Sequence, residues 1–349
     1  MDDDYAAALA LLLLIKKKQQ KKKRLWSRDW LKKRSEESVQ FRLFRKLKAQ
    51  DPDTLRQWTR LNDQQYQELL CLVTPLIEKQ NTNMRQAVTA AERLTLTLRY
   101  LATGECYRSL SCQFRISHNL ISSIIPAVSK AIYQVLQPLY VKLPSTTEEW
   151  QKVAVDADCK FMYVDVGACG RASDGGVWDK CSLKQAVESS LLNMPPAENI
   201  PFTNRKCPFV FVGDDAFPLK EYLMKPYPGR GESTATRIFN YRLSRARRTS
   251  ENAFGILATR FQVFRAPIRT TPENVKAITM AAVALHNYLI ETSRDTYTPP
   301  DFIDREDISI GRLNRGQMYQ HASAGVEKLH AIGRGHSNLA KQVQRVFQQ

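Results

Sequence analysis

Residues 208–218 read PFVFVGDDAFP, an apolar, β-prone run that ends in two adjacent aspartates. A near-continuous apolar run of this kind is typical of a strand buried on both faces of a sheet. The groups that follow such a strand are held rigidly at the sheet edge, where ligands often bind in open α/β sheets. Asp214 and Asp215 therefore indicate either a tight turn, closed by Pro218, or half of a metal site.

The charge of the chain indicates a polyanionic partner. Its 349 residues include 52 Lys+Arg and 35 Asp+Glu, a formal net charge of +17. Such an excess suits nucleic acid, so DNA is the expected partner. Residues 1–50 hold 15 Lys+Arg and 6 Asp+Glu, and KKKQQKKKR (16–24) lies among them. That run indicates a nuclear import signal, a phosphate-binding arm or a solvated tail, and we expect the protein in the nucleus, with the cytoplasm as the alternative.

The cysteines and the N-terminal apolar stretch exclude two other classes of protein. Seven cysteines include no CxxC pair and no histidine at zinc-ligand spacing, so neither a disulfide scaffold nor a zinc finger is expected. The stretch AAALALLLLI (6–15) follows three aspartates and is too short to span a bilayer. No membrane partner is expected.

Residues 61–145 show helical periodicity. Thr89 and Glu92 form a capping box that opens AERLTLTLRYLAT, and Gly104 ends that helix. A short helix over 106–114 and a three-residue turn lead to HNLISSIIPAVSKAIYQVL, which Pro126 is expected to kink. This layout predicts a helix-turn-helix, with a generic helical bundle as the alternative. The last helix would then present four side chains to the major groove: His118, Asn119, Ser122 and Ser123.

The period changes after residue 150. KFMYVDVG (160–167) alternates like a strand and, with the preceding VDADC, predicts a hairpin. A long helix follows from residue 238, and a heavily apolar helix over 273–293 contains His286, which we interpret as a core histidine rather than a metal ligand. From Arg294 the chain is polar, and we predict that 294–349 is mostly disordered.

Three motifs in order carry a family resemblance: GRASDGGVW (170–178), VGDDAFPLKEYLMKPYPG (212–229) and NYRLSRARRTSENAFGILATRFQVF (240–264). They resemble the PIF/Harbinger transposase superfamily, and most of all its domesticated, transposase-derived nucleases. The resemblance covers roughly residues 60–290 and includes the helix-turn-helix region. It implies an RNase H-like, DDE-type core in which three acids hold two Mg²⁺ or Mn²⁺ ions for DNA phosphodiester cleavage. It also implies a Myb/SANT-like protein as partner.

Matched motif by motif, the resemblance places the second acid of the triad at Asp214 and the glutamate at Glu251. Asp174 matches a family aspartate in the Ser-Asp-Gly loop and is a further candidate metal ligand. Arg247 and Arg248, on the same predicted helix as Glu251, are candidates for DNA contact. Asp215 is interpreted as a neighbour that adds negative charge.

The chain departs from the family between Ala154 and Val155. The first family aspartate belongs to an Ile-Asp-Gly strand that is absent here, so we expect cleavage to be impaired. The predicted fold class is α/β of mixed α+β type, with an RNase H-like core that lacks its first strand. The predicted parts are a basic segment (1–60), a helix-turn-helix domain (61–145), a nuclease domain (150–293) and a tail (294–349). The alternative function is a non-catalytic DNA-binding adaptor.

Overall fold

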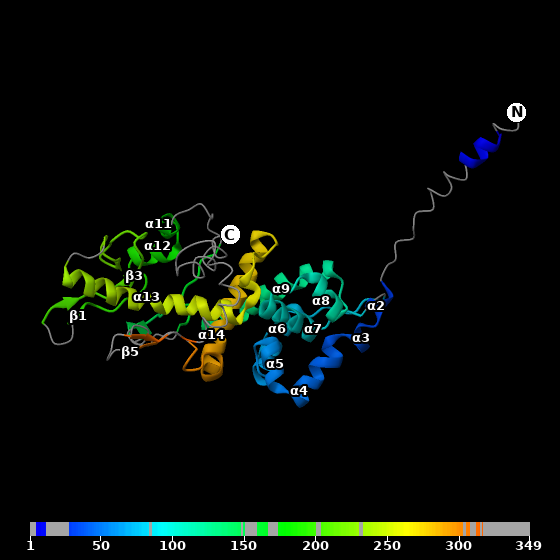
Figure 1. Cartoon of the computed structure of the whole chain (residues 1–349), viewed down its shortest axis with the longest axis horizontal. Coiled ribbons are helices and arrows are strands. Elements are labelled where there is room, and N and C mark those ends of the chain that lie inside the picture. The colour runs from blue at the N-terminus through cyan, green and yellow to red at the C-terminus, as the bar shows by residue number, and fades with distance from the viewer. Residues whose placement is uncertain are drawn as a thin grey trace.

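The computed structural model describes a largely helical protein whose strands are few and short (Figure 1). The described residues are 5–11, 28–83, 86–147, 149–150, 159–166, 174–199, 204–229, 233–302, 305–307, 312–314 and 316. The basic run 16–24 and the predicted tail beyond residue 316 lie outside them. Among the helices in these ranges, none is both long and apolar enough to cross a bilayer.

Short helical segments lead into the protein from residue 29. They are α2 (Asp29–Lys32), α3 (Arg34–Glu37), the π-helix η1 (Gln40–Phe44), α4 (Arg45–Gln50) and α5 (Pro52–Thr59). α5 begins at Pro52, because proline suits the first helical position and the Asp51 carboxylate accepts a hydrogen bond from the Thr54 N–H at 3.0 Å. It ends at Arg60, whose φ of 70° turns the chain toward the next helix.

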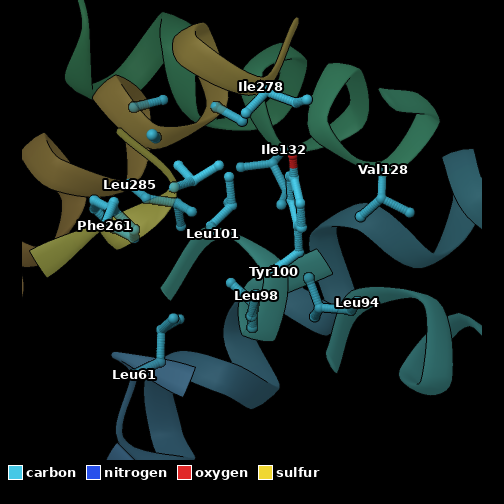
Figure 2. Packing of buried hydrophobic residues seen from close by; sticks show 14 of the residues in the cluster. Leu61, Leu94, Leu98, Tyr100, Leu101, Val128, Ile132, Phe261, Ile278 and Leu285 are labelled. Atoms are coloured by element: carbon cyan, nitrogen blue, oxygen red, sulfur yellow. The ribbon is translucent and has the colours of Figure 1, made fainter. Parts of the chain in front are cut away.

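One hydrophobic core joins the two halves of the sequence. It is built from α6 (Asp63–Ile77), α7 (Ala90–Thr103), α8 (Tyr107–Phe114), α9 (His118–Tyr140), the second half of α13 (Thr234–Arg260), the 3₁₀ helix η2 (Gln262–Arg265) and α14 (Pro272–Tyr297). α14 packs along α9, and Figure 2 shows Leu101 of α7, Ile132 of α9 and Leu285 of α14 in the same cluster. The helices that precede the DDE-like motifs are therefore packed against the helices that contain and follow them.

The predicted helical region agrees with the structure in detail. The Thr89 hydroxyl accepts from the Glu92 N–H at 3.2 Å, and the Glu92 carboxylate accepts from the Thr89 N–H at 2.9 Å, which confirms the capping box. Gly104 ends α7 with φ 68°, and Ser117 precedes α9 as predicted. α9 continues through Pro126 as a single helix, so the expected kink does not interrupt it.

Arg60 joins three helix ends. Its guanidinium donates to the carbonyl oxygens of Arg260 at 2.8 Å, Gln57 at 2.8 Å and Ala102 at 3.3 Å. These carbonyls lie in the last turns of α13, α5 and α7, where backbone acceptors have no partner inside their own helix. Burial, followed by the nearby charges of Arg260 and Arg99, lowers the pKa of Arg60 to about 10. The positive charges gathered here are balanced by the negative ends of the helices.

The predicted RNase H-like sheet is not formed by the described residues. Their strands make three separate pairs: antiparallel β1 (Glu198–Asn199) with β2 (Lys206–Cys207), parallel β3 (Phe211–Val212) with β4 (Leu223–Met224), and antiparallel β5 (Arg305–Asp307) with β6 (Arg312–Asn314). β3 confirms a strand in the opening motif, but the expectation that it is buried on both faces is wrong, because the Val212 side chain is 38% exposed. Among the described strands, β3 pairs with β4 alone, so it lies at the edge of a two-stranded sheet and not in the middle of a larger one.

The prediction of a strand over 160–167 is also wrong. Residues 159–166 are described, and none of them lies in a strand. The α14 side chains take the place of a neighbouring strand. Asn287 accepts from the Phe161 N–H at 2.9 Å and donates to the Phe161 carbonyl at 2.7 Å, while His286 Nε2 donates to the Cys159 carbonyl at 2.9 Å. The other half of the predicted hairpin, residues 155–158, lies outside the described residues.

The core interpretation of His286 is confirmed, and the start of the predicted tail is corrected. His286 is fully buried; its Nδ1 accepts from the Tyr297 hydroxyl at 3.0 Å, and burial lowers its pKa to about 4. α14 kinks at Ser293, where the helix was predicted to end, and then continues to Tyr297. The Arg260 guanidinium packs over the rings of Tyr297 and Phe302, at 5.4 and 4.4 Å from their centres, so residues 294–302 belong to the folded part.

Candidate functional site

The Asp pair lies in the loop that joins the parallel strands β3 and β4. The loop is closed by hydrogen bonds from the Phe211 N–H to the Tyr222 carbonyl and from the Gly213 N–H to the Met224 carbonyl, both at 2.8 Å. Gly213 allows a close approach, because a Cβ at this position would lie 3.1 Å from the Phe217 side chain, which would then have to shift by a few tenths of an ångström. The loop therefore has a defined shape, with the Phe217 ring folded back over its first residue.

The Asp214 carboxylate is used within the turn. Its Oδ1 accepts the Ala216 N–H at 3.0 Å, and its backbone carbonyl accepts the Phe217 N–H at 3.3 Å. This is an Asx turn, in which a side-chain oxygen mimics a backbone acceptor. The turn interpretation of the Asp pair is thus confirmed, and Asp215 is exposed beside it.

A small apolar cluster fixes the loop against the region of the first family motif. Trp178, Cys181 and Leu223 are buried together, and the Phe217 ring packs edge-on against Trp178 with ring centres 5.9 Å apart. Trp178 ends α11 (Asp174–Trp178), and Cys181 precedes α12 (Ser182–Glu188). The structure therefore brings the helix that begins at Asp174 to the Asp214 loop; the Asp174 side chain itself lies outside what is described.

α13 supplies the second predicted acid and a cation. Arg247 Nη2 lies 3.9 Å from Asp214 Oδ2, and both side chains are about one-third exposed, at 34% and 27%. Glu251 follows Arg247 by four positions, so the two residues share one face of the helix. Glu251 is exposed at the point where α13 passes into the core, since Asn252 and Ala253 are buried. The structure thus brings Glu251 to the same end of the protein as Asp214.

These residues do not fit a two-cation centre. Among the side chains that the structure describes, no three His, Cys, Asp or Glu gather closely enough to hold a metal ion. One oxygen of Asp214 is engaged by the turn and the other faces Arg247. Mg²⁺ and Mn²⁺ require several oxygen ligands at once. Asp165, another acid of the second half of the chain, is exposed on the segment held by α14, and Asp156 and Asp158 lie outside the described residues.

The helix-turn-helix candidates are placed together on one surface. His118, Asn119, Ser122 and Ser123 are all exposed at the start of α9, where the Ser122 hydroxyl donates to the Asn119 carbonyl at 2.7 Å. Their geometry is compatible with groove contacts, and their role in DNA binding stays a prediction. Residues 16–24, the basic run, lie outside the described part of the chain.

Two contacts were not foreseen from the sequence. Arg247 lies 3.9 Å from Asp214, a contact that no signal in the sequence indicated, and its predicted role in DNA contact stays a prediction. Asn287, an amide in an apolar helix next to His286, holds the segment that was expected to be a strand. A polar residue buried in such a helix must find hydrogen bonds, and that requirement was the only sign of its partner.

Comparison with known proteins finds similarities in the second half of the chain. Residues 151–287 match the family model described as DDE superfamily endonuclease. The chain is also 27% identical over 161 residues to Protein ALP1-like of Arabidopsis thaliana, a match that covers 45% of this chain and 39% of that protein. No solved structure matches. Residues 151–287 are therefore similar to the DDE superfamily endonucleases, and the chain shares a distant similarity with Protein ALP1-like over less than half of the length of either protein.

Proposed function

We propose that this protein binds DNA through its nuclease-derived half and that its metal-dependent phosphodiester cleavage is impaired. The observation that carries the proposal is the contact between Arg247 and Asp214 at 3.9 Å, in a region where the described carboxylates form no cluster of three. A guanidinium at this position already neutralises the carboxylate that the family motif assigns to a cation. A divalent ion would have to displace it and would find two acids rather than three.

The charge of the chain supports DNA as the ligand. A net charge of +17 favours a polyphosphate partner, and one arginine of α13, Arg247, lies beside the Asp214 loop. Nuclear location and a Myb/SANT-like partner belong to the same proposal and are supported by the family resemblance. Replacing Lys16–Lys18 and Lys21–Arg24 with Gln should reduce nuclear accumulation; unchanged localisation would remove that part of the proposal.

The test separates binding from cleavage. Binding of a labelled duplex is measured in EDTA, and cleavage of the same duplex is measured with Mg²⁺ and with Mn²⁺. We expect binding that weakens steeply with salt and cleavage at the background rate. Asp214→Ala should leave binding unchanged, as should the matched control Asp215→Ala.

Two outcomes would overturn the proposal. Cleavage that Asp214→Ala abolishes and Asp215→Ala preserves would show an intact nuclease in which another acid completes the site. Failure to bind duplex or single-stranded DNA at low salt would remove DNA as the ligand.

A further inference from the structure

The first half of α13 is a surface helix that continues a core helix. From Asn252 onward most of its residues are buried, whereas between Thr234 and Glu251 only Leu243 is buried. Figure 1 shows α13 running from the region of β1 and β3 into the helical bundle. This exposed half contains five arginines and a single acid, Glu251.

Its residues form a stripe in which an aromatic ring lies between positive charges. Arg237, Tyr241, Arg245 and Arg248 follow one another at spacings of four, four and three, so they share one face of the helix. We call these four residues the Arg–Tyr stripe. Tyr241 is 47% exposed and belongs to neither of the buried clusters among the described residues. At a rise of about 1.5 Å per residue, the flanking arginines are about 6 Å from it along the helix.

The stripe is distinct from the face that holds the loop. Leu243 is buried and Arg247 reaches Asp214 on one side of α13, while Asn240 bonds the backbone of Tyr227 on that same side. At 3.6 residues per turn, the centre of the Arg–Tyr stripe lies about 120° around the helix from that side, and the stripe ends at Arg248, three positions before Glu251. A ligand that follows the stripe would therefore arrive beside the two candidate acids.

We propose that the Arg–Tyr stripe binds an unpaired DNA strand, with a base stacked on Tyr241 and phosphates on the flanking arginines. Exposed aromatic rings within a basic track are the recognition elements of single-strand binding, because every unpaired base has a face that can stack. A duplex hides those faces and offers such a surface only its phosphates. The inference rests on the proposed function, since it names the form of DNA that this half of the protein takes.

The experiment measures anisotropy of a labelled (dT)₂₀ strand and of a duplex of equal length, in EDTA, with the full chain. Tyr241→Ala should weaken binding of the strand about thirtyfold, the middle of the range for loss of one stacked base, and leave the duplex nearly unchanged. Tyr241→Phe keeps the ring and should bind as the unsubstituted protein does. Arg237→Gln should lower the salt slope for the strand by about 0.7, whereas the exposed control Arg269→Gln should not.

Each outcome decides the inference. Equal losses for strand and duplex with Tyr241→Ala, or no loss for either, would overturn it, as would a Phe variant no better than the Ala variant. The readout is independent of metal, so cleavage assays leave it untouched. If strand binding depends on Tyr241 and the protein also shows full Mn²⁺-dependent cleavage, the inference is supported and the impaired nuclease is refuted. If strand binding does not depend on Tyr241 and cleavage stays at background, the inference is refuted and the impaired nuclease is supported.

Discussion

Replacement of Asn287 by leucine should loosen the segment 159–166 from the rest of the fold. The Asn287 side chain is 1% exposed, and its amide makes three hydrogen bonds to backbone atoms. Two of them join the N–H and carbonyl of Phe161, the pair of groups that a neighbouring strand would bond. The third is donated to the carbonyl of Tyr140, the last residue of α9, at 2.7 Å.

The expected cost follows from what the substitution leaves behind. Leucine has a similar size, so the main loss is three buried backbone groups without partners. Each such group costs about 1–3 kcal/mol, which gives about 3–5 kcal/mol once some water reaches the segment. That is a large share of the total stability of about 5–15 kcal/mol that is usual for a folded protein.

The chain offers a matched control. Asn240 makes the same pair of bonds to the N–H and carbonyl of Tyr227, at 2.9 and 3.3 Å, but at an exposed site. Asn240→Leu should therefore cost less than about 1 kcal/mol, because water replaces the lost amide. The same difference is expected in hydrogen exchange, where the Phe161 amide should lose protection only in the Asn287 variant.

Urea unfolding followed by circular dichroism gives the free energies, and hydrogen exchange of the peptide that contains Phe161 gives the local effect. Equal costs for Asn287→Leu and Asn240→Leu would refute the reasoning. So would a destabilised Asn287 variant whose Phe161 amide stays protected, because the amide would then not be what holds the segment.

Three further predictions concern single side chains. Arg247→Gln should raise the Mn²⁺ affinity of the Asp214 site about fivefold by titration calorimetry, since a half-exposed ion pair is worth about 1 kcal/mol; no change would mean that Arg247 does not compete with a cation. Arg60→Met should lower the free energy of unfolding by about 2–4 kcal/mol, and Arg60→Lys should not restore it, because an ammonium cannot reach three carbonyls. The pKa of His286, about 4 in the fold against 6.5 when unfolded, means that the unfolded state binds the extra proton between those values. Stability should therefore fall by about 3 kcal/mol more in the unsubstituted protein than in His286→Gln as the pH drops from 6.5 to 4, and equal losses in urea titrations would contradict the neutral, buried ring.

Local signals in the sequence were enough for the helices. The Thr89–Glu92 capping box, the stop at Gly104 and the turn before Ser117 are each decided by a few neighbouring residues, and all three are where the sequence predicts. The end of the apolar helix at Ser293 is likewise marked by a kink. Packing adds what these signals do not contain: α14 continues to Tyr297 because the Arg260 guanidinium, far away in the sequence, packs over the Tyr297 ring.

The strands and the site depended on partners that no local pattern names. Alternation over 160–167 predicts a strand only if another strand lies beside it, and here α14 lies there instead. The Asp pair was correctly placed after a strand and at a turn, but the sequence did not indicate that Arg247 would approach Asp214. Residue type was enough to predict the acidic residues of the site. Only the fold shows that Arg247 is the counter-ion of Asp214.

Both corrections concern the same part of the protein. The family resemblance predicts a strand between Ala154 and Val155 that carries the first acid; without it, a neighbouring segment loses its hydrogen-bond ladder and Asp214 loses a fellow ligand of a shared cation. Asn287 supplies backbone-like bonds to that segment, and Arg247 supplies a positive charge beside Asp214. Neither of these two contacts provides an oxygen ligand for a metal ion. The fold can therefore stay stable while cleavage is impaired. The Arg–Tyr stripe on α13 includes neither Asn287 nor Arg247, so the DNA binding that we propose for it does not depend on either contact.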